Sequence, residues 1–271
     1  MLFSILGIRV DNPRTDMDEI EDLFHENVAE DPGGSREIPT QPRREGQPFS
    51  RIFTGVCEVM VPLPNNDTTN PSPSRAEWME WLRNNRTEFS GGGPQIANNS
   101  CSYITNIMAT NYVNGRQNGA LPITNRANEG LYNSLGSFTP YDSLTIVSQE
   151  ATAGGAVAQI QLSTIMDRRN RQNNSRNVKE TIDSGWPVAI SIIRGNRLHA
   201  MLIIGYRYSF TERFDFDAEE RLIGYSYEET QPTFIAIDPA YDPAHPDALV
   251  DVSENELNTQ TNHIDAVGRQ Q

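Results

Sequence analysis

The order of the expected elements along the chain is the feature that most constrains its fold. Helical patterns come first: Ser74 begins an S-x-x-E capping box with Glu77, and apolar residues then recur at helical spacing. A second helical pattern starts at Cys101 and runs to Val113. After Trp186 the pattern changes to short β runs with turn signals between them. Helices followed by an antiparallel sheet predict an α+β fold.

Other patterns along the chain predict further elements. Helical spacing indicates two more helices, one within 157–167 and one over 175–183. The stretch 114–142 shows no period, and we expect it to be irregular. Runs rich in β-branched and aromatic residues predict strands within 51–63, 188–193, 198–206, 221–227 and 233–237.

Composition divides the chain into three parts. Residues 1–50 are charged and rich in Pro and Gly, which indicates a flexible or prosegment-like arm with a short amphipathic helix at 20–28. We expect residues 51–250 to form the globular domain and residues 251–271 a polar C-terminal tail. Three roles stay open for the arm: it binds a partner, it inhibits the chain itself, or it is a disordered leader.

Charge and hydropathy exclude several classes of partner. The formal net charge is −14, and so acidic a chain repels both nucleic acid and anionic membranes. No apolar run approaches the roughly 18 residues that a membrane span needs. The start of the chain lacks a basic region and a small-residue cleavage pattern, so we expect a cytoplasmic protein or one secreted without a Sec-type signal peptide.

Cysteine content argues against a disulfide framework. The chain has two cysteines, Cys57 and Cys101, and one bridge between them stays possible. No motif indicates a cofactor or a metal ion.

Cys101 is the candidate nucleophile. A thiolate, not a thiol, attacks carbonyl carbon, and the first turn of a helix lowers the pKa of a thiol placed there. Cys101 opens the second expected helix, although a buried structural cysteine is the alternative. Cys57 lies in a β-like run with no candidate base at suitable spacing, and we interpret it as structural.

Three further residues complete a candidate site. His199 is the one of four histidines that lies in an apolar strand pattern, where an imidazole could take the proton of a thiol. Asp238 ends a later β run and could orient that imidazole. Gln95 precedes Cys101 by six residues, and its amide could donate to an oxyanion beside the Cys101 backbone N–H.

Local motifs around these residues carry a family resemblance. Gly185-Trp186-Pro187-Val188 resembles a G-x-P-V strand, and residues 199–206 read H-A-M-L-I-I-G-Y. Asp238-Pro239 gives a D-P strand ending. With the Gln and Cys six residues apart, residues 90–240 resemble the papain-like cysteine peptidase superfamily. In motif style the chain is most similar to its bacterial leader-cleaving, bacteriocin-processing branch.

The resemblance implies a fold, a site and an activity. The fold would be papain-like, with an N-terminal helical half whose Cys helix packs on a C-terminal antiparallel β-sheet half. The resemblance assigns Cys101, His199 and Asp238 to a catalytic triad and Gln95 to the oxyanion hole. The activity would be that of a thiol protease, which cleaves a protein or peptide substrate through an acyl-enzyme.

Two other functions stay open on the same residues. One is a glutamine deamidase or transglutaminase-like toxin or effector, because the same triad supports deamidation and acyl transfer. The other is a catalytically inactive binding or assembly protein, in which the polar ends of the chain would be docking elements.

Overall fold

A computed structural model of the chain confirms the α+β fold class. The structure describes residues 36–38, 46–65, 72–132, 140–156, 160–240 and 249–269. The short helix expected at 20–28 and most of the expected N-terminal arm lie outside these residues.

The described residues form helices and strands, most of them where the sequence predicts them. The helices are α2 (Arg75–Phe89), α3 (Cys101–Asn118), the 3-10 helix η1 (Glu129–Leu131), α5 (Pro140–Ala153), α6 (Asn173–Asp183) and α7 (Glu254–Gln260). The strands are β1 (Arg36–Ile38), β2 (Phe49–Met60), β3 (Ile160–Thr164), β4 (Val188–Arg194), β5 (Arg197–Phe216), β6 (Leu222–Glu229), β7 (Thr233–Ile237), β8 (Leu249–Ser253) and β9 (Thr261–Arg269).

Hydrogen bonds connect the strands in the order β1-β2-β5-β4-β9-β3. Strand β6 pairs with β5, and β7 pairs with both β5 and β8. The expected hairpin of β4 and β5 forms around the Gly195-Asn196 turn, with antiparallel register from Val188 opposite Ile203 to Arg194 opposite Arg197.

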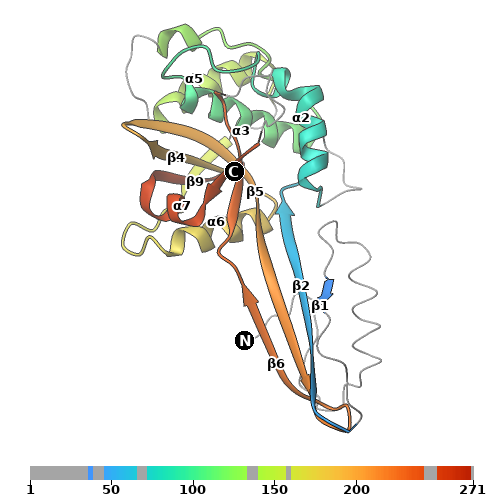
Figure 1. Cartoon of the computed structure of the whole chain (residues 1–271). Helices are drawn as coiled ribbons and strands as arrows, with labels where there is room; N and C mark the ends of the chain where they lie inside the picture. The colour runs from blue at the N-terminus through green and yellow to red at the C-terminus, as the bar shows by residue number, and fades with distance from the viewer. Residues whose placement is uncertain are drawn as a thin grey trace. The chain divides into compact units, whose positions relative to one another are not determined.

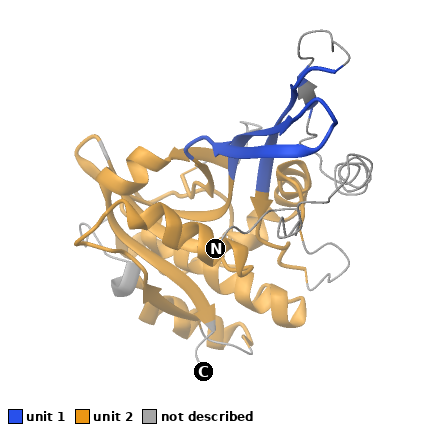
Figure 2. Cartoon of the chain, turned by 90° about the horizontal axis from the view of Figure 1, so that it is seen from below, with its two compact units in different colours: residues 1–58, 207–231 blue, residues 59–206, 232–271 orange. Residues whose placement is uncertain are grey.

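The chain forms two compact units, coloured in Figure 2. One comprises residues 1–58 and 207–231, and the other comprises residues 59–206 and 232–271. These units do not follow the boundaries near residues 50 and 250 that composition predicts. The reason is that β2 and β5 are long strands, and each begins in one unit and ends in the other.

The smaller unit is an antiparallel arrangement of strands. Phe210 of β5 lies opposite Glu229 of β6, and the two strands form a long antiparallel hairpin. Phe53, Phe214 and Phe216 are buried in a small aromatic cluster with Phe49 and Leu222 at its edge. This cluster gives the unit an apolar core of its own.

The larger unit places helices beside an antiparallel sheet. Helix α3 contacts β4 and β9, and Figure 1 shows α6 and α7 below these strands in a view in which α3 and α5 lie above them. The predicted cap of α2 is confirmed: the Ser74 hydroxyl accepts from the Glu77 N–H, and the Glu77 carboxylate accepts from the Ser74 N–H.

Helix α3 is buried on every side from residue 101 to residue 115, rather than on the apolar stripe that its sequence suggests. Two of its buried amides, Asn111 and Asn114, bind main-chain carbonyls. The Asn111 amide donates to the carbonyls of Glu88, Phe89 and Ile123, and its oxygen accepts from the Ile123 N–H at 3.0 Å. Asn111 therefore attaches the end of α2 and a later loop to the middle of α3.

Gly205, in the H-A-M-L-I-I-G-Y motif, permits a close approach of two strands. A Cβ at this position would lie 2.6 Å from the carbonyl oxygen of Val59. The next residue, Tyr206, donates its hydroxyl to Asp183 at the end of α6 at 2.6 Å. The motif thus joins β5 to both β2 and α6.

Three expectations are wrong. The helix expected within 157–167 is strand β3, because these residues pair antiparallel with β9. The stretch 114–142 includes the end of α3 and the start of α5. The polar tail expected at 251–271 instead supplies α7 and β9, and β9 lies between β4 and β3. Isolated buried residues such as Ile264 and Val267, in a polar stretch, are too few to reveal this strand by composition.

Candidate active site

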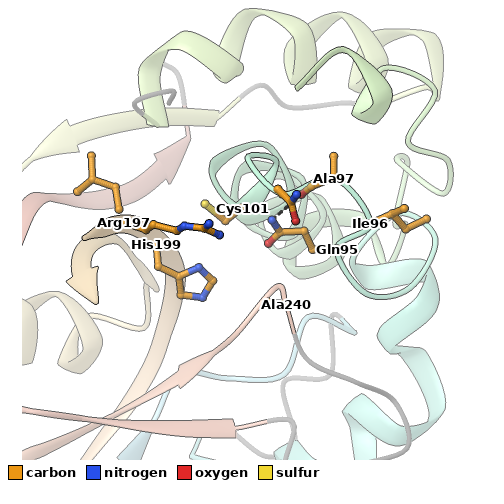
Figure 3. Close-up of a pocket in the computed structure, with 9 residues that line it drawn as sticks. Gln95, Ile96, Ala97, Cys101, Arg197, His199 and Ala240 are labelled. Atoms are coloured by element: carbon orange, nitrogen blue, oxygen red, sulfur yellow. Dashed lines mark hydrogen bonds between the residues drawn. The ribbon is translucent and has the colours of Figure 1, made fainter. Parts of the chain in front are cut away.

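The four residues singled out from the sequence come together where α3 begins beside β5. Figure 3 shows a cavity there. The cavity has a volume of about 340 Å³. Its lining combines polar and apolar side chains from three segments far apart in the sequence: Gln95, Ile96, Ala97, Asn98, Cys101, Arg197, Leu198, His199 and Ala240.

Cys101 is the first residue of α3 and is 8% exposed. The N-cap residue Ser100 makes no side-chain cap, and the backbone N–H of Ser102 in the first turn of the helix bonds the thiol. Burial raises the pKa of Cys101, but a hydrogen bond with His199 and backbone N–H groups of Ala200 and Ser102 outweigh burial and lower the pKa. The site therefore favours the thiolate. Both cysteines are free, so the disulfide left open by the sequence is absent.

His199 lies on β5 between Cys101 and Asp238. Its Nε2 is 2.8 Å from Asp238 Oδ1, which leaves Nδ1 for the thiol. Burial lowers the pKa of His199, yet the hydrogen bonds with Asp238 and Cys101 prevail and raise it to about 9. The imidazole is therefore positively charged at neutral pH.

Asp238 follows β7 and is held at two points. Its Oδ1 accepts the N–H of Ala240 at 2.8 Å in addition to the His199 contact. Its main-chain carbonyl accepts from Nη2 of Arg86, a buried residue of α2, at 2.5 Å. These contacts fix the carboxylate that orients the imidazole.

Gln95 lies in the loop before α3. Its backbone N–H donates to the carbonyl of Pro239 at 2.8 Å, and its side-chain nitrogen donates to the carbonyl of Ala97 at 2.6 Å. A primary amide nitrogen carries two N–H groups, so this contact uses one of them, and the amide oxygen is buried without a partner.

Glu129 of η1 is a buried residue that sequence reasoning missed. Its Oε1 accepts the N–H groups of Ile96 and Ala97 at 2.7 and 3.2 Å and the Ser100 hydroxyl at 2.8 Å. Its Oε2 lies 3.4 Å from Nε of Arg126. Glu129 thus holds the loop that connects Gln95 to Cys101. No local pattern indicates this role, because the contacts span about 30 residues.

Replacing Glu129 with Ala should destabilise the larger unit. The change leaves two N–H groups without their acceptor and removes the carboxylate that faces Nε of a buried guanidinium, so the free energy of unfolding should fall by about 3–5 kcal/mol. Urea denaturation measures the effect. Glu88→Ala, at an exposed carboxylate on α2, is the matched control and should leave the transition unchanged. A Glu129→Ala transition that coincides with wild type would contradict the assigned contacts.

Among the residues that the structure describes, no group of three or more His, Cys, Asp or Glu side chains could hold a metal ion. In the same residues, no helix is long and apolar enough to cross a membrane. Neither protein-family models nor curated proteins gave a match to the chain.

Proposed function

We propose that this chain is a papain-like cysteine hydrolase, and specifically a thiol protease that cleaves peptide bonds. The observation that carries the proposal is the contact series from Cys101 through His199 to Asp238. Lowering the pKa of the thiol and raising the pKa of the imidazole both favour a thiolate–imidazolium pair at neutral pH.

The first half-reaction would form an acyl-enzyme. The Cys101 thiolate attacks the substrate carbonyl carbon, and the carbonyl electron pair moves onto oxygen. The remaining N–H of the Gln95 amide and the Cys101 backbone N–H stabilise this oxyanion. As the carbonyl re-forms, the carbon–nitrogen bond breaks, and protonated His199 gives its proton to the leaving amine. The product is a thioester at Cys101 and a neutral His199.

The second half-reaction would release the acyl group. Neutral His199 takes a proton from water as the water oxygen attacks the thioester carbonyl. Collapse of the second tetrahedral intermediate expels the Cys101 thiolate, and the substrate carboxyl group leaves. Throughout both steps, Asp238 holds the ring through Nε2 and stabilises its positive charge.

Element order supports the papain-like assignment. The nucleophile opens a central helix, the histidine follows on an antiparallel strand, and the aspartate ends a later strand that pairs with the histidine strand. Helices α2, α3 and α5 precede the β4–β5 hairpin in sequence, and this order supports a helical half followed by a β half.

Product analysis tests the proposed activity. The chain should generate new peptide termini when it is incubated with a peptide library prepared from a proteome, as read by mass spectrometry. A rise of about 1 Da at glutamine without fragments would instead identify a deamidase. If the library is unaltered and Cys101 is no more reactive than Cys57, the remaining hypothesis is a catalytically inactive binding or assembly protein.

A further inference from the structure

Arg197 lines the cavity that contains Cys101 and His199, and nothing in the mechanism uses it. Its side chain is exposed and makes no hydrogen bond or ion pair with any residue that the structure describes. Two other arginines of the larger unit do have carboxylate partners: Arg75 pairs with Asp251 at 2.9 Å, and Arg126 lies beside Glu129. The guanidinium of Arg197 is thus available to a ligand.

The strand geometry directs Arg197 toward the reacting atoms. Arg197 and His199 are two residues apart on β5, so their side chains leave the same face of the strand, about 7 Å apart. Figure 3 shows the Arg197 side chain extending toward Cys101 and His199. A group bound by Arg197 would therefore belong to a part of the substrate close to the attacked carbonyl.

The cavity lining carries basic but no acidic side chains, although the chain as a whole is acidic. The sequence contains 36 acidic residues against 22 basic ones, yet none of the nine lining residues is acidic. A planar guanidinium without a protein carboxylate matches a ligand carboxylate, with which it can form two parallel hydrogen bonds. Ile96, 80% exposed, lines the same cavity and offers an apolar contact there.

We propose that Arg197 is a specificity-determining residue that binds a carboxylate of the substrate near the bond attacked by Cys101. The preferred substrates are then peptides with Glu or Asp close to the scissile bond. This inference rests on the proposed hydrolase function, but its first test needs only the reactivity of Cys101.

The first test compares two alkylating probes that differ in charge. Iodoacetate carries a carboxylate, whereas iodoacetamide is its neutral counterpart, and both alkylate the Cys101 thiolate. The rate of alkylation of Cys101 by iodoacetate, divided by the rate with iodoacetamide, should fall on the order of 10-fold in Arg197→Gln. The reason is that this variant lacks the guanidinium that attracts the anion. Peptide mapping by mass spectrometry follows Cys101 and Cys57 in the same sample.

Arg83→Gln is the matched control, since Arg83 is exposed on α2, has no partner among the described residues and lies outside the cavity. It makes the same change in net charge and should keep the wild-type ratio. An unchanged ratio in Arg197→Gln, or an equal fall in Arg83→Gln, would overturn the role of Arg197. Alkylation of Cys101 faster than Cys57 in that same experiment would still support the proposed nucleophile.

The second test uses substrates. Peptides cleaved by wild type are remade with Glu, Gln or Lys at each position near the cleavage site. Wild type should prefer Glu over Gln at one position by about 10- to 100-fold in kcat/KM. Arg197→Glu should reverse the preference toward Lys, and Arg83→Glu should not. Cleavage without any preference for Glu would overturn the acidic specificity and leave the hydrolase function standing.

Discussion

Replacing Cys101 with Ala should reduce peptide cleavage on the order of 10⁶-fold in kcat, to the level that binding and oxyanion contacts alone provide. Alanine has no atom that can form the thioester, so the acyl-enzyme cannot appear in intact-mass spectra. Cys101→Ser should be similarly inactive. A serine hydroxyl is much less acidic than a thiol, and the contacts that lower the pKa of Cys101 are insufficient to ionise it.

Cys57→Ser is the control for this result. Cys57 lies on β2 in the smaller unit, where it forms a hydrogen bond with Tyr208. Cys57 is remote in sequence from Cys101 and is not among the residues that line the cavity. We expect this variant to cleave peptides at the wild-type rate. Full activity in Cys101→Ala, or loss of activity in Cys57→Ser but not in Cys101→Ala, would reject the assignment of the nucleophile.

Local patterns sufficed to predict the elements that carry the site. The capping box at Ser74 and Glu77 is a contact between residues three apart, so the start of α2 can be read from four letters. The β4–β5 hairpin has a turn signal between two apolar runs, and its two strands, which are neighbours in the sequence, pair with each other. Cys101 and His199 were recognisable because each lies at the start or in the interior of such an element.

Long-range pairing explains what the sequence could not predict. The short run in β3 has no period that separates a strand from a helix, and its pairing with β9 joins residues about 100 apart. Burial of Asn111 depends on carbonyls of Glu88, Phe89 and Ile123.

The same limit applies to the candidate site. Glu129 acts on a loop more than 25 residues earlier, and no local pattern connects the two. In the sequence, Arg197 is only a residue that follows a turn. Its place in the lining of the cavity is visible only in the structure. The proposed nucleophile and base could therefore be singled out from the sequence, whereas the residues that position and surround them required the three-dimensional structure.

His199→Ala should reduce activity by at least about 10⁴-fold at all pH values, because no other group can protonate the leaving amine and then activate water. In wild type, catalysis needs the Cys101 thiolate and protonated His199 together. The pKa of His199 is raised to about 9, so activity should be lost as the pH rises through 9. On the acid side, activity should fall once the pH drops below the lowered pKa of Cys101.

Asp238→Asn should move the alkaline limit of this profile to lower pH by about one unit or more, because the carboxylate that supports the charged imidazole is gone. The Asn oxygen can still accept from His199 and from the Ala240 N–H, so the ring should keep its orientation and much of the activity near neutral pH. Asp251→Asn makes the same charge change at the ion pair with Arg75, outside the cavity, and should leave the limit near pH 9. Identical alkaline limits in wild type and Asp238→Asn would show that Asp238 does not sustain the charge on His199. The triad would then reduce to the Cys101–His199 pair.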